Sequence, residues 1–498
     1  MTTPHAAYQS LVERFRRIAL LGDAQAILSW DSATTMRPGS AEARAEVDAA
    51  LALEVHERLT APDLGEVFAA VDATTLDPWQ RANLDGMRRT WLHATAVPAD
   101  LVEAASRAAS QCEHRWRTAR HENDFDGLAP LLRTVLASQR EIAAAKAEAL
   151  GVSRYDALLD QYEPGGTSAR IDQLFDELSG FLPDLIATAL ERQASRPAPL
   201  PLDGHFPVAA QRDLGQRLMA ALGFDFDRGR LDVSAHPFCG GTPDDLRLTT
   251  RYNEQDFARA LMGTLHETGH ALYEAGLPAE WRHQPVGTAR GMSIHESQSL
   301  FVEMQLCRSL AFQHFLAPLV REAFGVDGPA WTPENLYAVG TRVQRSLIRV
   351  DADECTYPAH VLLRYRLERQ MIDGALDVAD LPDAWAEGMR RLIGITPPDH
   401  KDGCLQDIHW PSGAFGYFPT YTLGAMTAAQ LREAVDQAIP DLESQLAAGH
   451  FAPVVSWLRD AIHHRASSLP TDALLTHATG RPLDVAAYRR HLERRYLG

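Results

Sequence analysis

Apolar residues recur at helical spacing through the first part of the chain, from residue 8 to about residue 195. Stretches such as LVERFRRIALL and LVEAASRAASQ combine this spacing with many Ala, Leu, Glu and Arg residues, which favour helices. Residues three or four positions apart lie on the same side of an α-helix, so each stretch has one apolar side to bury. We therefore expect a helical array over this part of the chain.

The helical pattern is interrupted twice near the middle of the chain. Residues 196–207, RPAPLPLDGHFP, predict a linker or crossover, because proline lacks a backbone donor and clashes with the preceding helical turn. The run LRLTTRY, residues 246–252, predicts a short strand. We expect a mainly α fold with a minor sheet. The 498 residues are expected to form one domain, 1–498, with a helical lobe at 1–195 and a second lobe at 208–498.

A candidate metal site lies in the run FARALMGTLHETGHALYEAG, whose apolar residues recur about four apart and predict an amphipathic helix. His266 and His270 are also four apart, so both imidazoles lie on one face of that helix, close enough to bind one metal ion. Glu267 lies about 100° round the helix from His266 and can reach a water molecule there without being a ligand. The pattern H-E-x-x-H therefore indicates a zinc site, with Glu267 as the group that takes the proton of the attacking water.

A catalytic zinc site usually has three protein ligands and one open position. A second stretch with helical periodicity, GMSIHESQSLFVEMQLC, supplies Glu296 after 25 intervening residues. His295 and Glu303, in the same stretch, are competing candidates for the third ligand. Spacing favours Glu296, and ligands of N and O type suit Co²⁺ as well as Zn²⁺.

Composition narrows the class of partner. The 66 Asp and Glu residues against 48 Lys and Arg give a formal net charge of -18, which repels phosphate backbones, so we expect no nucleic-acid binding. No run of about 18 apolar residues predicts a membrane span. The N-terminal segment lacks the apolar core of a signal peptide, and the five cysteines form no C-x-x-C pair. These features predict a cytoplasmic protein with reduced thiols.

Six short motifs occur in order along the chain. They are HPF at 236–238, D-x-R-x-T at 245–249, H-E-x-x-H at 266–270, HESQS at 295–299, I-R-x-x-A-D at 348–353 and G-x-x-Q-D-x-H-W at 403–410. With these motifs the chain resembles the carboxypeptidase Taq family of metallocarboxypeptidases along nearly its whole length, and no motif position departs from the family pattern.

The resemblance implies a fold, an activity and a set of metal ligands. The implied fold is an almost wholly helical, saddle-shaped homodimer with a deep groove and a small sheet beside the metal. The implied activity is removal of single residues from the C-terminus of peptides, with broad specificity and refusal of terminal proline. Family members use zinc or cobalt, and their ligand pattern matches His266, His270 and Glu296, with Glu267 as the general base and acid.

Cleavage confined to the C-terminus requires a positive group that binds the terminal carboxylate. Arg349, in SLIRVDADE, is the best candidate, because a guanidinium offers two parallel donors and keeps its charge at any working pH. Asp351 or Asp353 is expected to orient it. The residues alone are equally compatible with a structural salt bridge, and the family resemblance favours the anchor.

Two other regions supply candidates for contacts with the substrate. The strand LRLTTRY suits an extended peptide that pairs with an exposed sheet edge. Within it, Arg247 is a substrate-binding candidate, although a packing role through a pair with Asp245 is favoured.

The segment GCLQDIHWPSGAFGYFPTYTLG has the composition of a flexible segment that closes over a groove. An oxyanion needs donors besides the metal, and we rank His409 first, Tyr421 second and Tyr417 third. For Tyr417 simple packing is favoured.

Two other functions stay open. An endo-oligopeptidase acting on short peptides would need no fixed carboxylate anchor, so Arg349 distinguishes it from a carboxypeptidase. A catalytically idle, metal-stabilised binding protein would usually have lost the general base, and Glu267 is present. We therefore expect a zinc-dependent metallocarboxypeptidase that acts on peptides.

Overall fold

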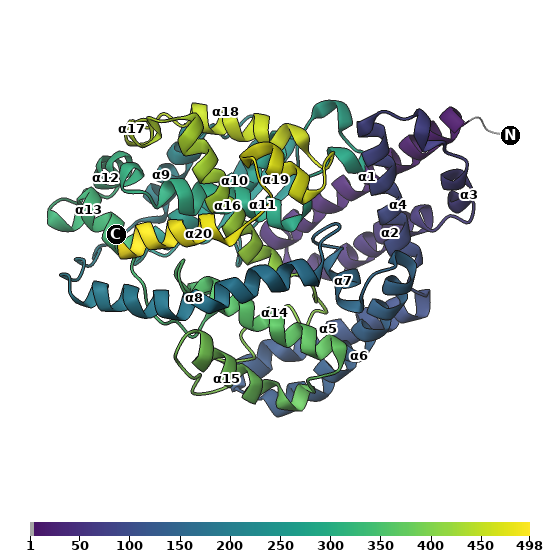
Figure 1. Ribbon diagram of the computed structural model, residues 1–498, viewed down its shortest axis with the longest axis horizontal. Coiled ribbons are helices and arrows are strands. Elements are labelled where there is room, and N and C mark those ends of the chain that lie inside the picture. Colours follow the sequence, from purple (N-terminus) through teal and green to yellow (C-terminus); the bar gives the residue numbers. More distant parts are fainter. Residues whose placement is uncertain (1–3) are drawn as a thin grey trace. The chain divides into compact units, whose positions relative to one another are not determined.

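The computed structural model describes residues 4–498, and helices make up most of them (Figure 1). The chain divides into two units, each assembled from separate stretches. The first unit comprises Met1–Ala94, Pro199–Gly340 and Thr427–Leu483, and the second comprises Thr95–Ala198, Thr341–Met426 and Asp484–Gly498. This partition differs from the lobes 1–195 and 208–498, and the expectation of a single domain stays a prediction.

The first unit carries the N-terminal helices, the sheet and the helices with the candidate metal ligands. None of the helices in the described part of the chain is long and apolar enough to cross a membrane. The helices of the first unit are α1 (Pro4–Thr34), α2 (Ala41–Leu59), α3 (Leu64–Ala69), α4 (Pro78–Thr95), α9 (Val208–Ala221), α10 (Phe257–Ala275), α11 (Gly291–Leu300), α12 (Leu310–Phe324), α13 (Pro333–Gly340), α17 (Leu442–Ala447), α18 (Ala452–Ala461) and α19 (Thr471–Thr479).

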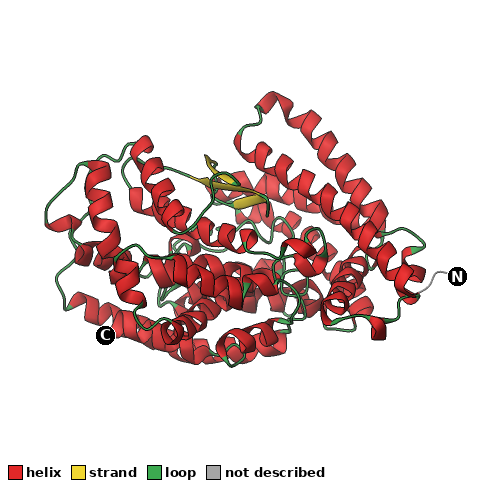
Figure 2. Cartoon of the chain, turned by 90° about the horizontal axis from the view of Figure 1, so that it is seen from above, coloured by secondary structure: helices red, strands yellow, loops and turns green. Residues whose placement is uncertain are grey.

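The sheet is small and lies against α10. Its strands are β1 (Gly229–Val233), β2 (Cys239–Thr242) and β3 (Asp245–Thr250), in the order β1-β3-β2, and Figure 2 shows them as the yellow elements among red helices. Strand β1 is parallel to β3 and β2 is antiparallel to it. Leu246 and Leu248 of β3 pack with Ala271 of α10 in one apolar cluster. The predicted fold class, mainly α with a minor sheet, is confirmed.

The position of β3 corrects one expectation. The strand predicted at 246–252 is present as β3, but it is the central strand, paired through Leu248 with Leu231 of β1 on one side and Cys239 of β2 on the other. A central strand has no unpaired edge, so an added peptide strand cannot pair with it. Edges suited to β-addition belong to β1 and β2.

The described residues of the second unit form helices and connecting segments, with no strand among them. Its helices are α5 (Ala99–Glu122), α6 (Phe125–Leu150), α7 (Arg154–Leu159), α8 (Ser168–Ala194), α14 (Tyr357–Asp373), α15 (Leu381–Leu392) and α20 (Val485–Leu492), which a π-helix (Glu493–Leu497) continues, while α16 (Pro419–Ala438) begins in the second unit and ends in the first. Helix α8 ends at Ala194 and α9 begins at Val208, which confirms the linker predicted between them.

The last residues of the chain are held by a buried carboxylate. Glu354 accepts hydrogen bonds from His491 at 2.7 Å, from Arg495 at 2.9 Å and from the hydroxyl of Tyr496 at 2.9 Å. The hydroxyl of Tyr488 donates to the backbone carbonyl of Glu354 at 3.1 Å. These bonds tie α20 and the following π-helix to the segment that precedes α14.

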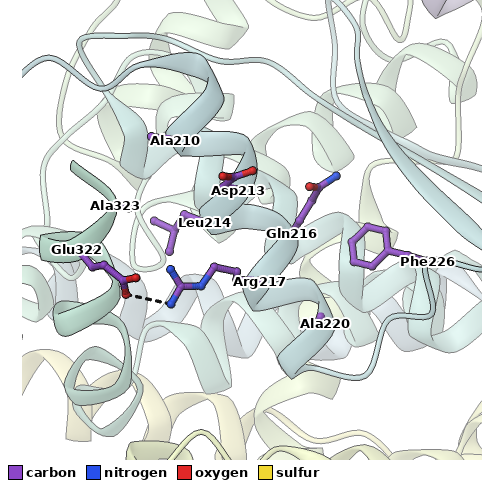
Figure 3. Close-up of a pocket in the computed structure, with 9 residues that line it drawn as sticks. All are labelled: Ala210, Asp213, Leu214, Gln216, Arg217, Ala220, Phe226, Glu322 and Ala323. Atoms are coloured by element: carbon purple, nitrogen blue, oxygen red, sulfur yellow. Dashed lines mark hydrogen bonds and ion pairs between the residues drawn. The ribbon is translucent and has the colours of Figure 1, made fainter. Parts of the chain in front are cut away.

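A surface hollow of about 800 Å³ lies between α9 and α12 in the first unit (Figure 3). Arg217 of α9 and Glu322 of α12 form an ion pair of 3.1 Å across it, and Phe226 lines one side. None of the residues predicted to bind metal or substrate lines this hollow. Its location does not coincide with the candidate site.

Candidate active site

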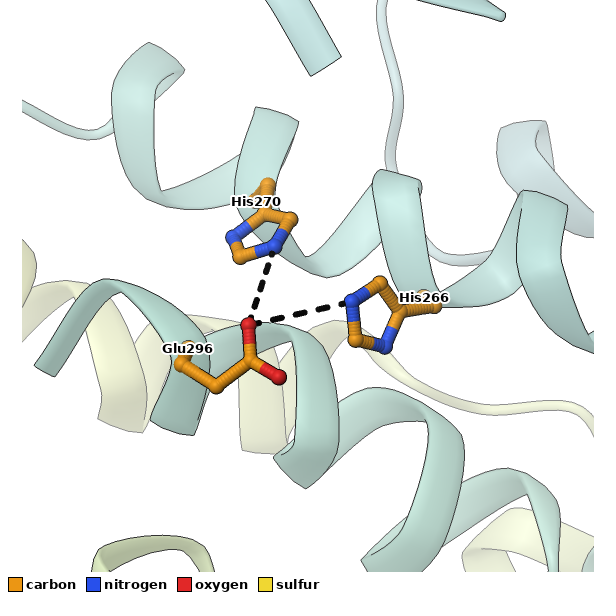
Figure 4. A group of neighbouring side chains, drawn as sticks. All are labelled: His266, His270 and Glu296. Carbon is orange, nitrogen blue, oxygen red and sulfur yellow. Dashed lines mark ion pairs between the residues drawn. The ribbon is translucent and has the colours of Figure 1, made fainter. Parts of the chain in front are cut away.

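The predicted H-E-x-x-H helix is present as α10. It begins at Phe257, after Asp256, whose side chain accepts hydrogen bonds from the backbone N–H groups of Ala258 and Arg259 and so satisfies donors that the first turn leaves unpaired. His266 and His270 lie one turn apart, with ring centroids 5.0 Å from each other. Both rings point toward Glu296 on α11, as Figure 4 shows.

A glycine between the two histidines lets α11 approach closely. A Cβ atom at Gly269 would lie 2.5 Å from the carbonyl oxygen of Gln298 and 2.6 Å from the Cα of Ser299, closer than atoms pack. Both contacts are with backbone atoms of α11, which cannot rotate away. The absence of a side chain at Gly269 therefore permits the helix contact that brings Glu296 to the histidines.

The three predicted ligands converge in a geometry that fits a metal ion. Oε2 of Glu296 lies 3.6 Å from Nε2 of His270 and 3.9 Å from Nε2 of His266, and the ligand atoms all lie within 4.8 Å of one another. Zinc lies about 2.0–2.2 Å from such ligands, so tetrahedral ligand atoms are roughly 3.3–3.6 Å apart. Small movements of the side chains would bring the group into that range.

The two competing candidates, Glu303 and His295, contact the Nδ1 atoms of the ligand histidines, the ring nitrogens that do not face Glu296. Oε2 of Glu303 lies 3.0 Å from Nδ1 of His266, and Nδ1 of His295 lies 2.7 Å from Nδ1 of His270. Glu303 belongs to a π-helix, Phe301–Cys307, that continues α11, and such segments often occur at functional sites. Spacing favours Glu296 without excluding these two residues, because all three lie on the same helical stretch.

The electrostatics of the cluster favour a cation. Burial alone would lower the pKa of His266, but the carboxylates of Glu303, Glu296 and Glu267 outweigh it and raise that pKa to about 10. Burial, followed by the nearby His295 and His266, lowers the pKa of His270 well below its usual value, which keeps this imidazole neutral as metal binding requires. Burial also raises the pKa of Glu267, to about 7. A divalent cation would displace the proton that the carboxylates stabilise on His266.

A second polar cluster, in the second unit, surrounds Arg349. Its guanidinium donates from Nε to Oδ1 of Asp407 at 3.0 Å and from Nη1 to the hydroxyl of Tyr357 at 3.1 Å, and Nη2 lies 2.9 Å from the same Oδ1. Arg364 donates from Nε to the other carboxylate oxygen of Asp407 at 2.6 Å. The side-chain amide oxygen of Gln406 accepts hydrogen bonds from Nη2 of Arg364 at 2.7 Å and from the backbone N–H of Arg349 at 2.8 Å. Two guanidinium groups thus share one carboxylate.

Arg349 is paired with a residue other than Asp353, one of the two aspartates expected to orient it. Asp353 accepts hydrogen bonds from the backbone N–H groups of Cys355 and Thr356, so it shapes the turn before α14 instead of holding the guanidinium. Asp407 fills that role, and the two guanidinium groups hold the pKa of its carboxyl well below the usual range although burial opposes them. Asp407 is 58 residues away from Arg349 in the sequence, so proximity along the chain could not identify it.

The candidate oxyanion donors lie in the same unit. Nε2 of His409 is 3.3 Å from the hydroxyl of Tyr421, and burial, reinforced by Arg349, lowers the pKa of His409 to about 4. Tyr417 packs edge to face against Tyr162, with ring centroids 5.0 Å apart, in keeping with the expectation that it packs.

Glu368 is a further functional residue that the sequence did not predict; it is fully buried and holds the segment that carries His409. Its carboxylate accepts from the hydroxyl of Tyr155 at 2.8 Å, from Nε1 of Trp410 at 2.9 Å and from the backbone N–H of Gly416. A signal was available, because His360, Arg364 and Glu368 recur every four residues within the apolar stretch of α14.

Arg247 is placed in the first unit by contacts within the protein. It pairs with Asp245, as expected, with Nη2 2.7 Å from Oδ2, and its guanidinium lies 4.3 Å from the ring centroid of Trp30 on α1. Such a stack adds cation–π attraction to the ion pair. These contacts support the packing role, and a contact between Arg247 and substrate stays a prediction.

Comparison with known proteins gives consistent matches over the whole chain. Residues 10–496 match the family described as carboxypeptidase Taq (M32) metallopeptidase. Thermostable carboxypeptidase 1 of Thermus thermophilus is 40% identical over 510 residues, covering 99% of each chain. Carboxypeptidase 1 of Bacillus subtilis is 32% identical over 503 residues, covering 99% of this chain and 98% of its own. The solved structure of Trypanosoma cruzi metallocarboxypeptidase 1 has a TM-score of 0.97 at 41% identity, over 99% of each chain.

The close approach at Gly269 predicts that Gly269→Ala destabilises the protein. Helix propensity alone would make alanine about 1 kcal/mol more favourable, whereas overpacking against the backbone of α11 costs about 1–3 kcal/mol and displaces Glu296. We expect a lower melting temperature and weaker metal binding in a titration. Gly263→Ala, on the same helix with nothing within 4 Å of the added Cβ, is the matched control and should not destabilise. Equal effects of the two substitutions would contradict the helix contact.

The buried carboxyl of Glu368 predicts a dependence of stability on pH. Burial raises its pKa to about 7 in the folded protein, above the value of an exposed glutamate, so the folded state favours the protonated form. This contribution is present below about pH 4.5 and is lost as the pH rises to 7, by up to about 3 kcal/mol. Glu368→Gln removes the titration. The difference in melting temperature between wild type and variant should therefore shift in favour of the variant between pH 5 and 8, and a constant difference would show an ionised carboxylate throughout.

Proposed function

Since the chain belongs to the carboxypeptidase Taq (M32) family and is therefore a metallocarboxypeptidase, we propose that it removes single C-terminal residues from peptides with broad specificity, using zinc held by His266, His270 and Glu296. The observation that carries this proposal is the convergence of the three ligand atoms within 4.8 Å of one another. The geometry does not distinguish zinc from cobalt, and zinc is proposed on the H-E-x-x-H pattern.

A metal ion held by these residues would lower the pKa of a water molecule and polarise the carbonyl of the scissile bond. Glu267 then has two tasks. Its carboxylate takes a proton from the attacking water, and it gives a proton to the nitrogen of the departing residue. The side chain is 8% exposed, and a carboxyl whose pKa burial has raised toward 7 is a suitable base and acid at neutral pH.

The cluster around Arg349 is proposed to bind the terminal carboxylate. A guanidinium has five N–H groups, and the hydrogen bonds to Asp407 and Tyr357 use one on Nε and one on Nη1. A terminal carboxylate would accept from N–H groups that these two bonds do not use. Arg349 and Arg364 share the single carboxylate of Asp407. These three groups therefore carry a net charge of one positive unit, which a bound carboxylate would neutralise.

His409 and Tyr421 are proposed as hydrogen-bond donors to the oxygen that becomes negative as the water attacks. The lowered pKa of His409 keeps its ring neutral at neutral pH, so it donates without a counter-charge. Removal of one such donor typically costs about 2.7–4 kcal/mol of transition-state stabilisation. The homodimer and the cytoplasmic location implied by resemblance and composition stay predictions.

The two alternative functions are not favoured. Relatives that match nearly the whole chain are named carboxypeptidases, which argues against an endo-oligopeptidase. The presence of Glu267 beside the ligand set argues against an idle binding protein.

Glu267→Gln should separate metal binding from turnover. The amide cannot take a proton, so we expect metal content to stay at the wild-type level while kcat falls by about 10²–10⁴-fold. The comparison variant is His270→Ala, which removes a ligand and should lose metal and activity together. Metal analysis of the dialysed proteins and hydrolysis of one free-acid peptide provide both readings. Wild-type turnover in Glu267→Gln would end the assignment of this residue as the base.

Arg349→Ala should weaken catalysis only for substrates with a free C-terminus. Loss of a charge-assisted bidentate contact should lower kcat/KM for a free-acid peptide by about 100-fold, and Arg349→Lys should recover part of it. The same peptide with an amidated C-terminus is expected to be a poor substrate that loses little more, since its contact is already absent. Arg366→Ala, which removes an arginine of α14 paired with the exposed Asp176, is the control. An equal loss on both peptides would place the anchor elsewhere.

A further inference from the structure

We propose that Glu303 and His295 are positioning residues of the metal centre, each fixing the tautomer and ring orientation of one ligand histidine. The inference rests on the proposed metal site, because it concerns the nitrogen atoms of His266 and His270 that face away from Glu296. The two residues that spacing left as rival ligands are thereby given a different task. Each belongs to a separate chain of hydrogen bonds that begins at one ligand histidine, and the two hydrogen-bond chains differ in chemical character.

The first hydrogen-bond chain supports His266 with an anion, the carboxylate of Glu303. Glu303 contacts Nδ1 of His266 at 3.0 Å through Oε2, and its Oε1 accepts from Nη2 of Arg308 at 2.9 Å. Arg308 in turn donates from Nη1 to the carbonyl of Gly340 at 2.6 Å. An ionised carboxylate accepts hydrogen bonds and cannot donate, so Nδ1 of His266 must carry the proton. In the neutral ring that metal binding requires, the lone pair is then on Nε2, the atom that faces Glu296 at 3.9 Å.

The second hydrogen-bond chain supports His270 with another imidazole, that of His295. His295 lies between two groups, with Nδ1 2.7 Å from Nδ1 of His270 and Nε2 2.9 Å from Oε1 of Glu274. Glu274 accepts from Nε2–H, so a neutral His295 has its lone pair on Nδ1 and accepts the proton of His270 Nδ1. That arrangement again leaves a lone pair on Nε2 of His270, which faces Glu296 at 3.6 Å. Both chains reach the same result from different partners.

The fold places these partners on two helical stretches. Glu274 follows His270 by four residues on α10, so the two side chains lie one turn apart on the same face. Glu303 follows Glu296 by seven residues, the last three of them in the π-helix, and both carboxylates lie beside histidines of α10. The carboxylate of Glu296 faces the Nε2 atoms of both histidines, and the carboxylate of Glu303 contacts Nδ1 of His266.

The difference between the two chains predicts unequal effects on metal affinity. A carboxylate behind an imidazole increases its basicity as a ligand, and loss of such a partner typically weakens metal binding by about 10–100-fold. Glu303→Gln retains an acceptor oxygen without the charge, so we expect a loss of about 10-fold. Glu303→Ala also removes the acceptor, and we expect about 100-fold. His295→Asn, which exchanges one neutral group for another, should cost less than Glu303→Ala.

The test measures zinc affinity of the full-length chain by competition with a chromophoric chelator, together with the visible spectrum of the Co²⁺-loaded protein, which reports ligand geometry. Melting of the metal-free variants shows whether each one folds. Glu322→Gln is the matched control, because it removes the charge of a glutamate paired with Arg217 across the hollow of Figure 3. We expect this control to bind zinc as the wild type does. His295→Asn and Glu274→Gln test the second chain independently if the Glu303 variants fail to fold.

Three results would overturn the inference. The first is zinc affinity within threefold of wild type in both Glu303→Ala and His295→Asn. The second is equal affinity in Glu303→Gln and Glu303→Ala, since a positioning role requires the acceptor to matter. The third is an unchanged cobalt spectrum in variants whose metal-free forms melt at lower temperature, which would indicate a role in folding alone. The proposed metal site fails on a separate result, namely wild-type zinc content in His270→Ala.

Discussion

Concentration of carboxylates around two imidazoles is the constraint on which the metal-binding part of the protein depends. Glu267, Glu296 and Glu303 are all buried beside His266 and His270, and Arg308 is the cation that pairs with one of them. Buried charge is costly unless a partner of opposite sign neutralises it. Three carboxylates outnumber the one guanidinium, and the proton that they attract to His266 balances only part of the excess. A divalent cation would supply positive charge at the point where the three ligand atoms converge.

The second unit has an imbalance of the opposite sign. Arg349 and Arg364 are both buried and are balanced by the one carboxylate of Asp407. Aromatic rings cover the remaining faces of these guanidinium groups, since Arg364 lies 4.4 Å from the centroid of Trp385 and Arg349 lies 5.0 Å from that of Tyr421. Such surroundings keep water away from the cations and so strengthen their attraction for a carboxylate ligand. Each unit thus contains a buried cluster with an excess of one sign of charge, which a bound ligand of opposite charge would neutralise.

The sequence predicted features that depend on spacing within one element. The helix around His266 and His270, the second helical stretch with Glu296 and the strand at β3 follow from periodicity of two or about four residues, and all are present. Features that depend on distant parts of the chain were missed. The neighbours of β3 arise from pairing with separate strands, which the sequence of β3 does not encode, so its central position was not foreseen.

Partners of charged groups show the same limit. A nearby aspartate was chosen for Arg349 because local pairs are the ones visible in a sequence, whereas Asp407 comes from a distant segment. The opposite difficulty arises for Glu296 and Glu303. They share one face of the same stretch, so periodicity treats them alike, and only the position of α10 distinguishes a ligand from its support.

The interleaved order of the two units has a consequence for how the protein is made. The ribosome releases the chain from the N-terminus, and residues 4–94 emerge long before Thr427–Leu483, with which they share the first unit. The second unit is completed only by Asp484–Gly498, whose His491, Arg495 and Tyr496 hold the buried Glu354 a few residues beyond Arg349. Domains generally fold as units during synthesis, but neither unit here has all of its segments until the ribosome has passed residue 483. The unit that holds the candidate metal ligands therefore lacks one of its segments while most of the chain is being synthesised.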